Sequence, residues 1–567
     1  MGKDGRDRSL LMEGISDEAS RNTLALNPLV AIRSEDLVES AGVLFRAVVN
    51  EPRVAAEQWL SFLSELGSIA AGRSERAPKA GDRRFTDPAW KDSFLHSGLL
   101  KAYLAWGEAV NALVDKTSLS DIDKARAHLV TEILVDAFAP TNALLTNPAA
   151  VRKLVDSGGR SAWQGLKNYL DDLVKNRGMP SMVDQTAFRV GENVATTPGA
   201  VIFRNELLEL IQYQPTTSSV WKRPLVITPP QINKYYALDL SPDKSMVRFL
   251  LESGIQVFCI SWRNPTADHR DWGLDSYVAA LDEAVDVARE VTGSDDISML
   301  GSCSGGITST AYLTTLGNAA ETKIRNMVLA VCLLDPNTAE ESAFGCLMTP
   351  ETMHVAKDAS RIRGIVDGHD LARMFAWMRP NDLIWNYWVN NYLLGNQPPA
   401  FDILFWNADT TRLPARLHGD YLDLYFTNPF VNPGKLTLND RAVDMTRTKV
   451  DSYVIAGVTD HITPWRGVHK TAQIMGEGTT FVLSNSGHLQ SLLNPPNNPK
   501  ASFMMGTVNP AGPEAFLAAA EKRKGSWWLD WRDWLHARSG EQVSAPVSLG
   551  SDRHPIIVSA PGTYVFD

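Results

Sequence analysis

The stretch ISMLGSCSGGI, residues 297–307, predicts both a turn in the fold and a site of chemistry. Its first four residues read as a buried strand, and the run that follows it favours a helix. Between them stands Gly-x-Cys-x-Gly-Gly, with Cys303 at its centre. A sharp strand-to-helix turn needs small residues two positions before and after the central residue, and Gly301 and Gly305 meet that need. We therefore predict that Cys303 is a nucleophile on a strained turn, at a helix N-terminus that favours its thiolate.

Two backbone N–H groups are expected to face a developing oxyanion beside Cys303. The turn aims the N–H of Ser304 there, and the loop after the first predicted strand of the sheet supplies the second. That loop reads PPQINKYY, residues 229–236, and Ile232 is its candidate donor. A lone Gly-x-Cys-x-Gly turn is weak evidence for catalysis, because small residues gather in many such turns. Motifs elsewhere in the chain are therefore needed to support a catalytic role for Cys303.

Two later loops supply candidates for an acid and a base. The strand-like run at 453–456 leads into a loop that contains Asp460, and the run at 480–483 leads into a loop that contains His488. Catalytic triads on α/β-hydrolase folds follow the order nucleophile, acid, base, with the last two in loops after late strands. We therefore predict Asp460 as the acid and His488 as the base.

Both assignments have alternatives. Asp460 could cap a turn, and His461 could be the working base. His461 directly follows Asp460, and adjacent side chains rarely face each other, so we favour His488, which also follows a glycine. His354 and His469 are expected to be structural.

From residue 224 onward, short β-branched runs alternate with helical stretches, which predicts a parallel sheet built from β-α-β units. The chain up to about Leu210 reads instead as amphipathic helices. We expect an α/β-hydrolase fold with a flexible segment at 1–36, a helical domain at 37–215 and a catalytic domain at 216–567. The predicted strands cover 224–228, 256–261, 297–301, 327–333, 451–456 and 479–483, with a helix over 276–291.

The strand rhythm stops between residues 336 and 443, which predicts an inserted cap or lid. This insertion is rich in bulky aromatic side chains suited to cover an apolar cleft, and Trp406, Asn407 and Tyr425 are candidates for lining a substrate channel. Its composition supports a packed helical subdomain without a ligand equally well. Tryptophans at 527–534 predict a helix docked on the core.

Composition limits the classes of function. Of 567 residues, 44% are apolar, which indicates a globular protein. The net charge of -10, without a basic stripe, argues against a nucleic-acid partner. No stretch approaches ~18 consecutive apolar residues, and residues 1–20 lack the apolar core of a signal peptide. We therefore expect an intracellular protein without a transmembrane segment.

The four cysteines predict neither a disulfide framework nor a metal site, because they form no Cys-x-x-Cys pair and have no histidine at metal-ligand spacing. Cys259 and Cys332 lie in apolar runs, where cysteine acts as a small hydrophobe. Cys346 has no basic neighbour to activate it. We expect these three to be structural.

Cysteine as the nucleophile favours acyl transfer over hydrolysis. Attack of a thiolate on a thioester gives another thioester at nearly equal free energy, so the acyl group stays activated for a second acceptor. If the acyl group carries a hydroxyl, His488 can deprotonate it, and repeated transfer builds a polyester. The aromatic insertion would keep water away from the acyl-enzyme.

Several motifs together resemble those of the poly(3-hydroxyalkanoate) synthases. The likeness spans about residue 37 to the C-terminal end, and two further motifs resemble the single-component class II enzymes, which prefer medium-chain (R)-3-hydroxyacyl-CoA. The shared motifs are GSCSGG (301–306), PPQINKYYALDL (229–240), SWRNP (261–265) and FWNAD (405–409), and the class II motifs are RPND (379–382) and WNYW (385–388).

This resemblance implies polymerisation of (R)-3-hydroxyacyl-CoA with release of coenzyme A, through a thioester on Cys303, with Asp460 and His488 completing the catalytic set. It also implies a homodimer at the surface of polyester storage granules in the cytoplasm, and no cofactor apart from the coenzyme A that the substrate carries. Two alternatives remain: a thioesterase or polyester depolymerase of the same fold, and a non-catalytic granule-coat or scaffold protein.

Overall fold

The computed structural model places most of the chain. Residues 1–33, and hence nearly all of the segment predicted to be flexible, lie outside the part that it describes, and so does Cys346. Among the described helices, none is both long and apolar enough to cross a membrane. The described residues are 34–79, 82–339, 350–370, 380–460 and 462–567.

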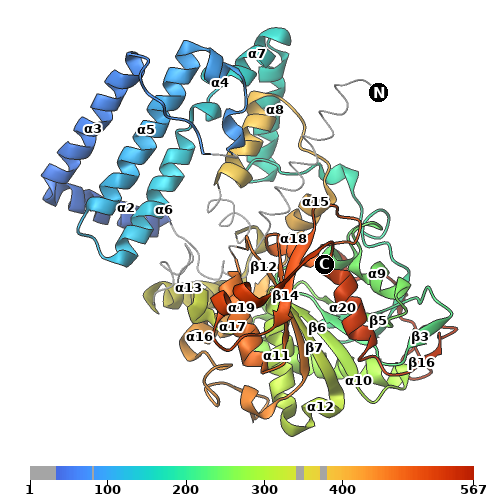
Figure 1. The fold of residues 1–567 in the computed structure, drawn as a ribbon. Coiled ribbons are helices and arrows are strands. Elements are labelled where there is room, and N and C mark those ends of the chain that lie inside the picture. The colour runs from blue at the N-terminus through green and yellow to red at the C-terminus, as the bar shows by residue number, and fades with distance from the viewer. Residues whose placement is uncertain (1–33, 80–81, 340–349, 371–379, 461) are drawn as a thin grey trace.

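A helical bundle precedes the sheet (Figure 1). Local sequence sets several of its helix starts: Ser93, Ser120 and Asn147 each accept a first-turn backbone N–H, and Pro52 opens a further helix. The helices are α2 (Ser34–Asn50), α3 (Pro52–Ala70), α4 (Ala89–Asp92), α5 (Phe94–Lys116), α6 (Asp121–Ala137), α7 (Pro148–Asp156) and α8 (Arg160–Lys175).

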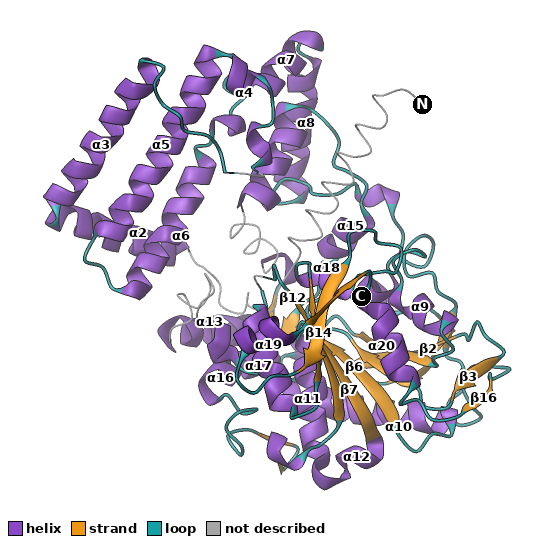
Figure 2. Ribbon diagram, viewed as in Figure 1, coloured by secondary structure: helices purple, strands orange, loops and turns teal. Residues whose placement is uncertain are grey.

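An 11-stranded mixed sheet forms the centre of the rest of the chain (Figure 2). Its order is β15-β14-β13-β12-β7-β6-β4-β5-β2-β1-β17, and the neighbours from β5 to β13 pair in parallel. All six predicted strands are confirmed, as β4 (Leu225–Thr228), β5 (Val257–Trp262), β6 (Ile297–Ser302), β7 (Ile324–Ala330), β12 (Asp451–Gly457) and β13 (Thr480–Ser484). The flanking strands are β1 (Gly199–Arg204), β2 (Leu208–Tyr213), β14 (Ser502–Thr507), β15 (Glu521–Lys524) and β17 (Val558–Ser559).

Helices cover both faces of the sheet and bury two apolar cores. One core gathers side chains of α10, α11 and α17, and the other gathers those of α9, α15 (Asp402–Ala408) and α20. The predicted helix at 276–291 is confirmed within α10. The helices are α9 (Met246–Glu252), α10 (Leu274–Thr292), α11 (Ser304–Leu316), α12 (Ala320–Lys323), α17 (Trp465–Met475), α18 (His488–Leu492), α19 (Pro513–Ala519) and α20 (Trp527–His536), and a small ribbon pairs β3 (Ser219–Trp221) with β16 (Gln542–Ser544).

The prediction of helix up to Leu210 is wrong for β1 and β2, which join the main sheet, so the predicted boundary at 215/216 falls too late. All six residues of β2 are buried, including Glu209, and the strand therefore shows no alternation of polar and apolar residues. The Glu209 carboxylate accepts hydrogen bonds from the guanidinium of Arg204 on the paired strand β1, and from the distant backbone N–H groups of Thr563 and Tyr564. A local pattern cannot reveal such partners.

The predicted insertion lies between β7 and β12 and is largely helical. Its described residues also form two π-helical segments and two short ribbons. Its described elements are α13 (Pro350–Arg363), β8 (Ile365–Val366), η9 (Asn381–Trp385), η10 (Trp388–Leu393), α15 (Asp402–Ala408), β9 (Leu413–Pro414), α16 (Ala415–Thr427), β10 (Thr437–Leu438) and β11 (Arg441–Ala442).

The tryptophans of α20 dock on the core, as predicted. Trp527, Trp528 and Trp531 are fully buried. The indole N–H of Trp527 donates to the carbonyl of Ser491 at 2.7 Å, and that of Trp528 donates to the carbonyl of Leu492 at 3.1 Å. Helix α20 therefore anchors the C-terminal end of α18, the short helix that begins at His488.

Candidate active site

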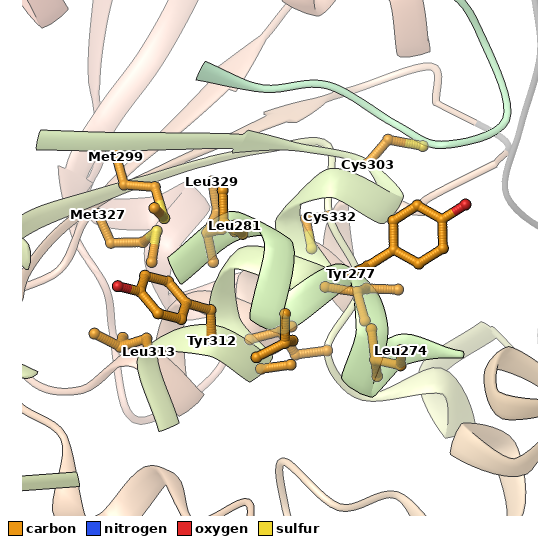
Figure 3. Close-up of a cluster of buried hydrophobic side chains, with 14 of the residues drawn as sticks. Leu274, Tyr277, Leu281, Met299, Cys303, Tyr312, Leu313, Met327, Leu329 and Cys332 are labelled. Atoms are coloured by element: carbon orange, nitrogen blue, oxygen red, sulfur yellow. The ribbon is translucent and has the colours of Figure 1, made fainter. Parts of the chain in front are cut away.

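Cys303 occupies the predicted turn between β6 and α11. Its backbone has φ 54° and ψ -122°, a conformation that costs energy for a residue with a Cβ. The backbone N–H of Cys303 donates to the carbonyl of Ala330 at 2.9 Å, which ties the turn to the neighbouring strand β7. Figure 3 shows Cys303 at the edge of the buried cluster and Cys332 within it.

The glycines of the turn are required by close packing. A Cβ on Gly301 would lie 2.6 Å from the Cα of Gly306, and a Cβ on Gly305 would lie 2.2 Å from the carbonyl oxygen of Thr228. A Cβ on Gly306 would meet the sulfur of Cys332 at 2.7 Å. Strand β6, helix α11 and the end of β4 can therefore meet only without side chains at these positions.

His488 and Asp460 meet as predicted. The Nδ1 atom of His488 lies 2.7 Å from Oδ2 of Asp460, and both side chains are buried. Gly457, at the end of β12, permits the approach of the two loops, because a Cβ there would lie 2.5 Å from the hydroxyl oxygen of Ser491. The alternative base His461 lies outside the described residues.

Asp460 is held as a carboxylate by four contacts. Its Oδ1 accepts the backbone N–H groups of Ile462 and Thr463 at 2.9 and 3.0 Å, and its Oδ2 accepts the Thr463 hydroxyl at 2.6 Å besides His488. Burial opposes ionisation, but the charge of His488 and these hydrogen bonds outweigh it, and the pKa of Asp460 lies below its ordinary value. Asp460 both caps this turn and binds His488, so a turn-capping role and a role as the partner of His488 are compatible.

The pKa of His488 is raised to about 10. Burial alone would lower the pKa, but the charge of Asp460, the charge of Cys303 and hydrogen bonds to both side chains outweigh it. His488 is therefore coupled to Asp460 on one side and to Cys303 on the other. The three predicted residues form one connected site.

Of the histidines and cysteines expected to be structural, His469, Cys259 and Cys332 are buried, and Cys346 lies outside the described residues. His354 is exposed, and His469 packs between the rings of Phe481 and Phe516. Burial raises the pKa of the Cys259 and Cys332 thiols well above the usual value, which keeps both neutral. No cluster of side chains able to hold a metal ion occurs among the described residues.

The loop after β4 runs beside the turn. Ser304 is the first residue of α11, and its hydroxyl accepts the backbone N–H of Gln231 at 3.3 Å. Ile232, the next residue, is buried. Gln231 is held by its side chain as well, since its Nε2 donates to Thr308 and its Oε1 accepts the hydroxyl of Tyr421 from α16 of the insertion. The insertion thus positions the loop that carries the candidate oxyanion donor.

The three residues predicted to line a substrate channel lie at two different places in the structure. Tyr425 lines an apolar pocket next to the Asp460 loop. Trp406 and Asn407, on α15, are buried away from the lining of that pocket. The indole N–H of Trp406 donates to the carbonyl of Lys234 at 2.7 Å, so Trp406 supports the loop after β4.

The sequence did not predict three groups of residues that hold the site in place. They are Thr463, which donates a hydrogen bond to Asp460; Gln231 and Tyr421, which are hydrogen-bonded to each other beside the Cys303 turn; and the tryptophans that anchor α18. Only Thr463 had a local signal, because an Asp followed three residues later by a Thr forms a compact hydrogen-bonded turn. The others act through contacts between residues far apart in the chain.

Comparison with known proteins identifies the fold and the family of this chain. The family model described as "Poly-beta-hydroxybutyrate polymerase (PhaC) N-terminus" matches residues 81–250, and the model for the "alpha/beta hydrolase fold" matches residues 224–495. The predicted α/β-hydrolase fold is therefore confirmed.

Curated relatives extend the match to nearly the whole chain. Poly(3-hydroxyalkanoate) polymerase 1 of Ectopseudomonas oleovorans is 48% identical, covering 97% of this chain and 98% of the relative. Polymerase 2 of the same organism is 45% identical, covering 95% and 96%. The polymerase subunit PhaC of Cupriavidus necator is 38% identical, covering 88% and 85%. This chain belongs to the poly(3-hydroxyalkanoate) polymerase family of acyltransferases.

Proposed function

We propose that this chain polymerises medium-chain (R)-3-hydroxyacyl-CoA into poly(3-hydroxyalkanoate) through a thioester on Cys303. The observation that carries this proposal is the buried coupling of Asp460, His488 and Cys303, which ends at a strained turn on a helix N-terminus. An acyl group on such a sulfur stays activated, and the adjacent imidazole can deprotonate an attacking hydroxyl.

The first step loads the acyl group. His488 is protonated at neutral pH in the free enzyme because its pKa lies near 10, and its imidazolium stabilises a thiolate on Cys303. The thiolate attacks the thioester carbonyl, and the oxyanion faces the N–H of Ser304 and a loop N–H for which Ile232 is the candidate. The carbon–sulfur bond to coenzyme A breaks, and the leaving sulfur takes the proton of His488.

The second step lengthens the chain. The charge of Cys303 and its hydrogen bond help to raise the pKa of His488, and a thioester removes the charge, so acylation lowers that pKa. Neutral His488 then takes the hydroxyl proton of the next monomer, whose oxygen attacks the Cys303 thioester. An ester bond forms as the Cys303 carbon–sulfur bond breaks. The restored thiolate takes the lengthened chain back from the monomer's thioester and releases coenzyme A.

The class II assignment and the cellular setting belong to the same proposal. The identities to the E. oleovorans polymerases, which exceed the identity to the C. necator subunit, support a single-component enzyme. We place the protein in the cytoplasm, as a homodimer at the surface of polyester granules. An exposed apolar stripe on α8, with Trp163, Leu170 and Val174, supports contact with an apolar surface.

The product distinguishes this function from a thioesterase. Purified protein is supplied with (R)-3-hydroxydecanoyl-CoA, and free thiol, insoluble polyester and soluble hydroxy acid are measured. We expect one free thiol for each hydroxyacyl unit recovered in polyester. Soluble 3-hydroxydecanoic acid as the main product would establish hydrolysis instead, and absence of thiol release would favour the scaffold alternative.

Thr463 is a positioning residue for this reaction. In a Thr463→Val variant, Asp460 loses a 2.6 Å hydrogen bond to a charged group, and we expect turnover to fall by roughly 10- to 100-fold. The lost hydrogen bond also raises the pKa of Asp460, so the acid limb of the pH–rate profile should move to higher pH. The checks are steady-state thiol release across pH and the melting temperature.

A matched control is Thr446→Val. Thr446 also donates its hydroxyl to an aspartate, Asp444, at 2.6 Å, but at an exposed turn outside the site. We expect its pH–rate profile to match that of wild type. An unchanged acid limb in Thr463→Val would show that the hydroxyl contributes to folding alone.

A further inference from the structure

A small apolar pocket opens beside the catalytic residues. It has a cavity volume of about 40 Å³ for the centres of water-sized spheres. Hydrocarbon forms most of its lining. A slot of this size accepts a slender chain and excludes a nucleotide, so the position of its floor determines how many carbons can enter.

One wall of the pocket belongs to the catalytic apparatus. Ile307 lies one helical turn after Cys303 on α11, and Ile462 and Thr463 form the turn that holds Asp460. The Thr463 hydroxyl oxygen lies 3.2 Å from Nδ1 of His488. A substituent a few bonds from a carbonyl on Cys303 is therefore within reach of this pocket.

The opposite wall comes from the insertion. Leu424 and Tyr425 lie on α16, and Phe430 follows that helix. Leu424 and Phe430 are 7% and 4% exposed, which makes them fixed parts of the wall rather than surface side chains. The insertion, and not the sheet, therefore closes this side of the pocket.

Two hydrogen bonds fix this wall against the sheet. The Tyr421 hydroxyl donates to Oε1 of Gln231 at 2.9 Å, and Nδ2 of Asn428 donates to Oδ1 of Asp335 at 2.8 Å. The first bond joins α16 to the loop after β4, and the second joins its C-terminal cap to the segment after β7. The depth of the pocket is therefore set by side-chain size, because its walls are tied together at the middle and at the C-terminal end of α16.

We propose that this pocket binds the alkyl side chain carried by C3 of the hydroxyacyl group, and that Leu424 and Phe430 set the chain length that it accepts. The inference rests on the proposed polymerisation of hydroxyacyl-CoA. C3 carries both the alkyl chain and the hydroxyl, so seating the chain here also orients the hydroxyl relative to His488. Each methylene that enters contributes to selectivity by roughly fourfold.

The first test fills the pocket with Leu424→Phe. We expect kcat/KM for (R)-3-hydroxydecanoyl-CoA to fall by about tenfold or more relative to that for (R)-3-hydroxyhexanoyl-CoA, because about three methylenes lose their place. Free-thiol release measures both rates, and the hexanoyl rate should stay within about threefold of wild type. A ratio equal to that of wild type would overturn the proposal.

The second test deepens the pocket with Phe430→Ala, or with the milder Phe430→Leu if alanine unfolds the protein. We expect (R)-3-hydroxydodecanoyl-CoA to gain severalfold over the decanoyl substrate. Phe426→Ala is the matched control, because Phe426 lies on α16 but is 53% exposed and outside the pocket lining. Its substrate ratios should equal those of wild type, and an equal change in all three variants would show a general effect of the insertion.

The two proposals fail in different ways. If wild type releases no thiol from either substrate, or makes only soluble hydroxy acid, the polymerase proposal fails. If wild type and the variants make polymer with the same preference for chain length, the polymerase proposal stands and the pocket assignment fails.

Discussion

Cys303→Ala is expected to lower coenzyme A release by about 10⁴-fold or more and to abolish polymer formation. No other described cysteine can take over, because burial holds the thiols of Cys259 and Cys332 in the neutral form. The fold should persist, since an alanine methyl fits wherever the cysteine Cβ now stands. Thiol release, polymer recovery and the melting temperature measure these three outcomes.

Cys259→Ala is the control for the loss of a buried thiol. Cys259 lies in β5, inside the core on the other face of the sheet, so the variant should lose some stability and keep its turnover. Mass spectrometry of the acylated wild type should locate the hydroxyacyl group on the peptide that contains Cys303. Turnover in Cys303→Ala equal to that of wild type would exclude Cys303 as the nucleophile.

His488→Gln is expected to lower turnover by about 10²- to 10⁴-fold, the range for loss of a general base. Glutamine keeps a polar side chain against Asp460 and should preserve the fold. His461→Ala is the comparison, because it tests the alternative base directly. A loss of turnover confined to His461→Ala would transfer the role of base to His461.

Alkylation of Cys303 gives a second readout of His488. The pKa of His488 lies near 10, so its positive charge is present below that pH and is lost as the pH rises through it. The imidazolium should attract the anionic form of the sulfur, so at neutral pH Cys303 should react with iodoacetamide faster in wild type than in His488→Gln, where the positive charge is missing. Equal rates in the two proteins would contradict the ion pair.

The candidate catalytic residues could be predicted because each stands in a local pattern with a strict steric cause. Gly301 and Gly305 flank Cys303, since backbone atoms come within 3 Å of where their Cβ atoms would lie. Asp460 and His488 each follow a buried strand whose apolar run is visible in the chain. The strands of the parallel sheet were recognised for the same reason.

Where the predictions from the sequence failed, the cause lies in contacts between residues that are distant in the chain. β2 has no polar–apolar alternation because both of its faces are buried, and Glu209 is tolerated there only because Arg204 and the segment at 563–564 reach it. The role of Trp406 could not be predicted from the sequence either, because its hydrogen bond joins α15 to a loop about 170 residues earlier. A sequence pattern gives information on residues that are close in the chain. It gives none on contacts that form between distant residues when the chain folds.

The sequence by itself determined the candidate nucleophile, its candidate partners in order along the chain, and the parallel sheet that carries them, because strained turns and buried strands restrict the residues at each position. Only the tertiary structure decided how Gln231 and Tyr421 support the site and where an apolar pocket meets it. Those features depend on distances between residues separated by many tens of positions, and such distances are set by the packing of the insertion against the sheet.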